Sequence, residues 1–113
     1  MYLLLKTSEV TPKLINTIRF FIEVDFVTIG LLDDNNSKDK MSYEDRLFVL
    51  NGLVICDPVD VDIVCQDKLD PTENLIKYKC KSMAVYGDWE EYEIEALKKL
   101  GLTRLEVKFK PKK

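Results

Sequence analysis

Residues 2–32, YLLLKTSEVTPKLINTIRFFIEVDFVTIGLL, decide the fold. Tyr2–Lys6 is apolar at consecutive positions, which is typical of a strand covered on both faces. Thr11 can cap a helix, and Pro12 suits the first helical position because an N–H there would be unpaired anyway. Residues 26–32 are again apolar on both faces and predict a second strand, parallel to the first because a helix separates the two. The stretch therefore predicts a β-α-β unit.

The helix of this unit should present one apolar face to the core. Val10 can pack against Ile15 as a hydrophobic staple at the start of the helix. Apolar side chains then recur at three- and four-residue spacing, at Leu14, Ile15, Ile18, Phe21 and Ile22.

A second β-α-β pattern is predicted near the C-terminus. Residues 75–86 (LIKYKCKSMAVY) predict a strand with lysines on its outer side. Asp88 can cap the helix that follows, with Glu91 three residues later as in a capping box, and Gly101 can end it. Residues 102–109 then predict a closing strand.

Between these units the sequence predicts a long loop and a series of antiparallel strands. Residues 33–46 have almost no apolar content and predict an exposed loop. The Asn51-Gly52 pair predicts a type I′ turn that joins strand 47–50 to strand 53–56. Residues 59–66 (VDVDIVCQ) alternate in polarity and predict a half-buried strand.

The predicted architecture is a single α+β domain over residues 1–113, with two helices on one face of a mixed sheet of about six strands. The predicted order is β-α-β-β-β-β-β-α-β. The two ends resemble a ferredoxin-like arrangement with a hairpin inserted in the middle. In this topology the strand 2–6 contacts the strand 102–109.

The composition is that of a small soluble globular protein, with 46% apolar and 33% charged residues. No apolar run reaches the roughly 18 to 20 residues needed to cross a bilayer, and the first ten residues lack the features of a signal peptide. Three cysteines without C-x-x-C spacing predict reduced, buried thiols and a cytoplasmic location; they are Cys56, Cys65 and Cys80.

Residues 54–71 hold five aspartates and two cysteines and raise the question of a metal site. The chain has no histidine, and the spacing of the acids fits neither a zinc site nor a calcium loop. Asp60 and Asp62 could hold Mg²⁺, so a divalent-metal-dependent enzyme is one alternative. The lack of histidine and of nucleotide-binding or nucleophile motifs favours a protein without catalytic activity or cofactor.

The charge is distributed unevenly: residues 1–76 carry a net charge of −7 and residues 77–113 carry +4. We predict that the protein binds a basic protein partner through an acidic face, with one methionine and one tyrosine as apolar anchors. Small acidic inhibitors, such as toxin immunity proteins and phage antagonists of host defence, provide an analogy at the level of composition. The predicted partner-binding residues are Asp33, Asp34, Asp39, Met41, Tyr43, Glu44, Asp45, Asp57, Asp60, Asp62, Asp67 and Asp70.

Nucleic-acid binding is a second alternative, because lysines on the predicted C-terminal strands could line a sheet face and neutralise phosphates. The same lysines could instead guard an exposed sheet edge, and the sequence pI near 5.0 opposes a general affinity for polyanions. An exposed edge could also pair two copies in a homodimer. The lysines concerned are Lys77, Lys79, Lys81, Lys108 and Lys110.

Overall fold

One parallel sheet organises the molecule. In the computed structural model, which describes residues 1–6, 11–54 and 61–107, the sheet has five strands in the order β3-β2-β1-β4-β5. All four pairings are parallel. From the central β1 the chain runs outward to β2 and β3, then crosses back over β1 to β4 and β5. The direction of winding therefore reverses between β1 and β4. The strands are β1 (Tyr2–Leu5), β2 (Val27–Leu32), β3 (Val61–Gln66), β4 (Ser82–Tyr86) and β5 (Thr103–Leu105).

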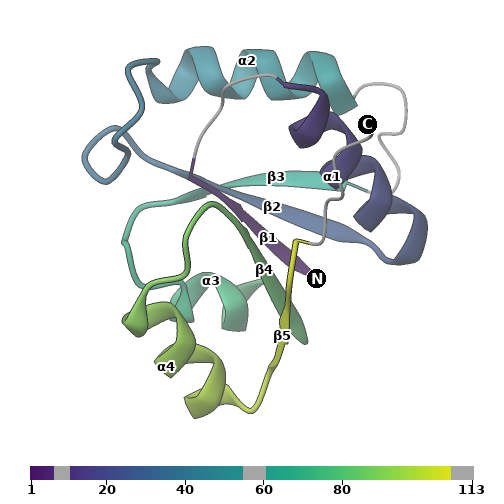
Figure 1. Cartoon of the computed structure of the whole chain (residues 1–113). Coiled ribbons are helices and arrows are strands. Elements are labelled where there is room, and N and C mark those ends of the chain that lie inside the picture. Colours follow the sequence, from purple (N-terminus) through teal and green to yellow (C-terminus); the bar gives the residue numbers. More distant parts are fainter. Residues whose placement is uncertain (7–10, 55–60, 108–113) are drawn as a thin grey trace.

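Four helices connect the strands and cover both faces of the sheet. Figure 1 shows α1 and α2 on one side of the sheet and α3 and α4 on the other. Each parallel pair needs such a crossover, because a short turn cannot bring the chain back to start a second strand in the same direction. The helices are α1 (Pro12–Val24), α2 (Tyr43–Val54), α3 (Thr72–Lys77) and α4 (Glu91–Leu100).

The strand β1 is buried on both faces, as its continuous apolar sequence predicts. Leu3 and Leu5 belong to the core cluster beneath α1 and α2, while Tyr2 and Leu4 belong to the cluster beneath α3 and α4. Alternating side chains of one strand thus enter two separate cores. At about 25 cal/mol per Å² of apolar surface removed from water, burial on both faces makes β1 a main source of stability.

The predicted β-α-β unit is confirmed. Thr11 Oγ1 accepts a hydrogen bond from Leu14 N at 3.2 Å and caps α1, and Pro12 occupies the first turn. The predicted apolar face of α1 points to the core, and β2 pairs with β1 in parallel. Val10 lies outside the described residues.

The predicted hairpin around Asn51-Gly52 is wrong, because residues 43–54 form α2. Ser42 Oγ accepts a hydrogen bond from Asp45 N at 3.2 Å, which is an N-cap at the start of this helix. The side chains that α2 turns to the core, including Leu47 and Leu50, recur at helical spacing. Asn51 and Gly52 are exposed, so the helix tolerates them at a modest cost in propensity.

The predicted lysine-bearing strand over residues 75–86 is also wrong in its first half. Lys77 ends α3, Lys79 lies in a turn with φ of 53°, and β4 begins only at Ser82. The Asp70 carboxylate accepts the amide hydrogen of Thr72 at 2.8 Å at the start of α3. An alternation of apolar and polar residues over so few positions does not distinguish a strand from a short helix followed by a turn.

The C-terminal unit is confirmed in outline and corrected in detail. The helix α4 begins after Glu90, not after Asp88. Gly101 ends the helix as predicted, with a φ of 68°. The strand β5 covers only Thr103–Leu105 within the described residues, and it pairs with β4. The predicted contact between the first and last strands is therefore wrong, because β4 occupies the position beside β1.

The combination of helices with one sheet is thus confirmed. A mixed sheet of six strands, two helices on a single face and ferredoxin-like ends with an inserted hairpin are not. Parallel strands with helices on both faces form a doubly wound fold. Within the described residues, no helix is long and apolar enough to cross a membrane.

Candidate functional site at the carboxyl end of the sheet

Polar residues gather where the parallel strands end. Lys6 follows β1, Asp33 follows β2, Asp67 follows β3, and Asp88 lies two residues after β4. Asn36 ties two of these loops together, since its Nδ2 donates to Asp33 Oδ1 at 2.7 Å and to the Asp67 carbonyl at 3.0 Å. In doubly wound sheets this edge, where the winding reverses, is the usual position of a ligand. The described part of the chain has a pocket there.

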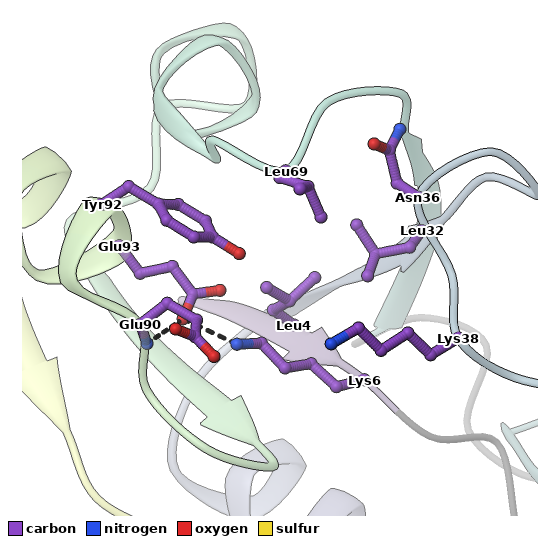
Figure 2. Close-up of a pocket in the computed structure, with 9 residues that line it drawn as sticks. All are labelled: Leu4, Lys6, Leu32, Asn36, Lys38, Leu69, Glu90, Tyr92 and Glu93. Atoms are coloured by element: carbon purple, nitrogen blue, oxygen red, sulfur yellow. Dashed lines mark hydrogen bonds and ion pairs between the residues drawn. The ribbon is translucent and has the colours of Figure 1, made fainter.

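The pocket has a volume of about 100 Å³ and lies between the loop after β2, the loop before α3 and the first turn of α4. Figure 2 shows Leu4, Leu32 and Leu69 above the two lysines, with Glu90 and Glu93 at the left of the view. An apolar wall with a few converging polar groups is the usual composition of a small-molecule site. The lining residues are Leu4, Lys6, Leu32, Asn36, Lys38, Leu69, Glu90, Tyr92 and Glu93.

A buried ion pair forms the base of the polar side. Lys6 Nζ lies 2.8 Å from Glu93 Oε1 and donates a second hydrogen bond to the Asp88 carbonyl at 2.5 Å. These bonds use two of the three N–H groups of the Lys6 ammonium. Glu93 Oε1 also accepts the Glu90 amide hydrogen at 2.7 Å. Because Glu90 N–H belongs to the start of α4, the helix terminus fixes the carboxylate in place.

The second oxygen of Glu93 has no partner. The Glu93 side chain is 0% exposed, and its Oε2 makes no hydrogen bond to any described residue. A carboxylate carries about four lone-pair positions, and leaving buried ones unpaired costs free energy. Glu93 lines the pocket, and its Oε2 is a buried acceptor in need of a donor.

Lys38 and Tyr92 complete the polar side. Figure 2 shows Lys38 extending its ammonium group toward the Lys6 side chain, and the Tyr92 hydroxyl pointing into the pocket. No described carboxylate lies within ion-pair distance of Lys38 Nζ. Burial, and then the neighbouring carboxylates of Glu93 and Glu90, raise the pKa of Tyr92. Tyr92 therefore stays a neutral hydrogen-bond donor at physiological pH.

Several of the predicted partner-binding aspartates form hydrogen bonds within the fold. Asp33 Oδ1 accepts from Asn36, and Asp34 Oδ1 accepts the Tyr43 amide hydrogen at 2.7 Å and lies 3.6 Å from Arg46 Nη2. Asp39 Oδ1 likewise accepts the Met41 amide hydrogen at 3.1 Å, and Asp70 binds Thr72. These carboxylates fix turns and helix starts, a role that aspartate favours for its short acceptor side chain.

The other predicted partner-binding residues divide into two groups. Met41, Glu44, Asp45, Asp62 and Asp67 are exposed, and all but Asp62 lie toward the carboxyl end of the sheet. Tyr43 is half-buried and packs on the core, so it is not a free anchor. Asp57 and Asp60 lie outside the described residues.

Neither alternative site gains geometric support. Lys77, Lys79 and Lys81 are exposed but do not share a strand, and helices cover both faces of the sheet. Lys108 and Lys110 lie outside the described residues. The described part of the chain also holds no group of three potential metal ligands, and Asp60 belongs to the part not described.

The cysteine prediction is correct for one of the two cysteines that the structure describes. Cys80 is buried and Cys65 is exposed, and both are free thiols. Partial desolvation of the thiolate at Cys65, and burial at Cys80, raise the pKa of the two thiols. Cys56 lies outside the described residues.

The sequence reasoning did not identify Lys6, Lys38 or Glu93 as site residues. For Glu93 a signal exists: it falls on the same helical stripe as the buried Ala96 and Leu97. A charged residue on an apolar stripe needs a partner from elsewhere in the fold. For the two lysines the only signal is that each lies near the end of a strand. This signal identifies a shared site only when the order of the strands in the sheet is known.

The sequence matches no protein-family model, and no curated protein matches it either.

Proposed function

We propose that this protein binds a small molecule with an anionic group in the pocket at the carboxyl end of β1. The observation that carries the proposal is the pair of ammonium groups, Lys6 and Lys38, in one pocket wall, with no described carboxylate in ion-pair contact with Lys38. Two cations that line one small pocket repel each other. An anion between them converts this repulsion into attraction and uses the third N–H of Lys6.

The surroundings support the same ligand. The leucine wall excludes water from one side of the bound group, which lowers the local dielectric constant and strengthens its contacts with the lysines. Tyr92 and Asn36 add neutral hydrogen-bonding groups. The site belongs to the class of ligand pockets that form where a doubly wound sheet reverses its winding.

The test is a titration followed by amide NMR, with inorganic phosphate, acetate and malonate as probes. We expect at least one probe to shift the amide signals of Lys6, Lys38 and Glu93 in a saturable way. Lys38→Met should weaken that binding at least fivefold, since it removes one cation and keeps the length of the side chain. Lys40→Met is the matched control, because Lys40 is exposed in the same loop and does not line the pocket.

A second variant tests the location. Leu69 is 46% exposed at the pocket, so Leu69→Trp places a ring over the opening without burying a new charge. We expect this variant to fold and to lose the probe-induced shifts. Shifts that are unaffected by both Lys38→Met and Leu69→Trp would place anion binding elsewhere on the protein.

Protein binding through the acidic surface is a second candidate. The observation that favours it is the exposure of Met41, Glu44, Asp45 and Asp67 toward one end of the sheet. We propose that a basic protein surface would contact these residues, because complementary charge accelerates encounter. Asp67→Lys should then slow association with a captured partner and reduce its dependence on salt. Unchanged association kinetics would remove this candidate.

A further inference from the structure

We propose that the ligand of this pocket is a small amino carboxylate, a molecule that carries an ammonium group as well as an anionic group. The inference rests on the proposed function and names the class of molecule that the pocket takes. Its basis is a feature that an anion alone leaves unexplained, the unpartnered Oε2 of Glu93.

Glu93 Oε2 requires a donor that the described residues do not supply. Its carboxylate is fully buried, and the Lys6 ammonium and the Glu90 amide both bind the other oxygen, Oε1. A carboxylate group such as that of acetate cannot satisfy Oε2, because both groups would be acceptors. An ammonium or another N–H donor on the ligand would form a charge-assisted hydrogen bond with it.

The charges of the lining residues also match a zwitterion. The lining holds two cations, Lys6 and Lys38, and two anions, Glu90 and Glu93. Figure 2 shows the two carboxylates beside α4 and Lys38 on the opposite side of the pocket. A ligand with one charge of each sign can therefore orient its anionic end toward Lys38 and its ammonium end toward Glu93. A divalent cation fits less well, because the Lys6 ammonium occupies one carboxylate oxygen.

The volume limits the ligand to a small one. A volume of about 100 Å³ is small beside the roughly 300–1,000 Å³ of pockets that hold drug-sized ligands, so the part of the ligand within the pocket is small. Linear amino carboxylates of two to four carbons are small ligands of this kind. The separation of the ammonium and carboxylate groups increases along this series. The member that binds most tightly therefore indicates the distance between the two groups that hold it, Lys38 and Glu93.

The experiment compares whole ligands with their halves in the full chain by amide NMR. Glycine, 3-aminopropionate and 4-aminobutyrate are titrated beside acetate and methylammonium. We expect one amino carboxylate to bind at least tenfold more tightly than either half. Lys38→Met should remove most of that advantage, and Lys40→Met should preserve it.

A variant at Glu93 tests the donor contact directly. Glu93→Gln keeps an acceptor for the Glu90 amide and removes the charge that would hold the ligand ammonium. We expect it to bind acetate at least as tightly as the native protein, because a negative charge beside Lys6 is removed, and to lose the preference for the amino carboxylate. If this buried substitution unfolds the protein, the comparison of whole and half ligands in the native chain still decides the question.

Two results would overturn the inference, and they differ in what else they remove. If acetate or phosphate binds as tightly as every amino carboxylate, then the ligand is an anion without the ammonium group, and the proposed function stands. If no probe shifts the signals of the pocket amides, then Glu93 Oε2 is paired only with water, and both the inference and the proposed function fail.

Discussion

Replacing Gly52 with alanine distinguishes the helix α2 from the hairpin that the Asn51-Gly52 pair suggests. In the structure Gly52 lies in the last turn of α2, and a Cβ added there meets no atom within 4 Å. Alanine removes backbone freedom from the unfolded chain and suits a helix better than glycine. The substitution should therefore stabilise the protein.

The expected magnitude follows from this environment. Glycine costs about 0.5–1 kcal/mol relative to alanine in a helix interior, and the lower half of this range applies near a helix end. In a type I′ turn the same residue would need a positive φ, and alanine would cost about 1–2 kcal/mol. The two structures therefore predict changes of opposite sign.

Urea unfolding followed by circular dichroism measures the difference. With an m-value of about 1.5 kcal/mol/M, the helix predicts an increase of about 0.3–0.5 M in the midpoint for Gly52→Ala. Gly101→Ala is the matched control, because a Cβ at Gly101 also meets no atom within 4 Å while its φ is 68°. We expect the control to lower the stability by about 1 kcal/mol. A lower midpoint for Gly52→Ala would refute the helical assignment.

Three further predictions concern the core and the ion pair. Gly30→Ala should destabilise the protein by about 2–3 kcal/mol, because the added Cβ overlaps the Tyr2 ring; a smaller loss in urea unfolding would mean that the ring can move. Tyr2→Phe should cost about 1–3 kcal/mol at pH 7, because the Tyr2 hydroxyl donates to a buried amide oxygen at 2.8 Å. Burial raises the pKa of Tyr2, so the unfolded chain ionises first, near pH 10. Native stability should then fall by up to about 1.4 kcal/mol per pH unit above that pH, and the phenylalanine variant should lack this loss. Lys6→Met should cost about 3 kcal/mol by leaving Glu93 buried without its cation, and adding Glu93→Gln should recover more than about 1 kcal/mol. Purely additive effects in that double-mutant cycle would show that the two side chains do not interact.

The parts of the fold that the sequence predicts correctly are those with several independent signals. For α1 the cap at Thr11, the proline at the first turn and the apolar stripe all agree, and the structure confirms each. The β1 strand has only one plausible environment, since four consecutive apolar residues need cover on both faces. The stop at Gly101 follows from its left-handed conformation.

The errors occurred where one strong local signal competed with weaker periodic ones. Asn51-Gly52 is a strong turn signal, yet in the structure Ser42 caps a helix by accepting the Asp45 amide hydrogen at 3.2 Å. Leu47 and Leu50 then continued its buried face. The tertiary contact of that face with the sheet outweighed the turn preference of two exposed residues.

The site was predicted less well than the fold because its residues are distant in the sequence. Lys6, Lys38 and Glu93 meet only when β1 lies beside both β2 and β4, with α4 packed across its end. No short motif encodes that arrangement. Acidic residues dominated the prediction because they are numerous, whereas the structure uses many of them in turns.

The carboxylates of Asp33 and Asp34 differ from that of Glu93 in the hydrogen bonds they already make. This difference bears on which of them can gain a contact from a ligand. The carboxylates of Asp33 and Asp34 are already bonded within their own loops, so a partner would compete with the contacts that hold those loops. Glu93 differs, because one oxygen is held by the protein and the other is unpaired and fully buried. A buried unpaired acceptor costs about 1–3 kcal/mol, and a ligand donor that satisfies it recovers this free energy as affinity. Exposed carboxylates offer no such gain, because water already solvates them. This difference supports the proposed binding of a small ligand in the pocket beside β1.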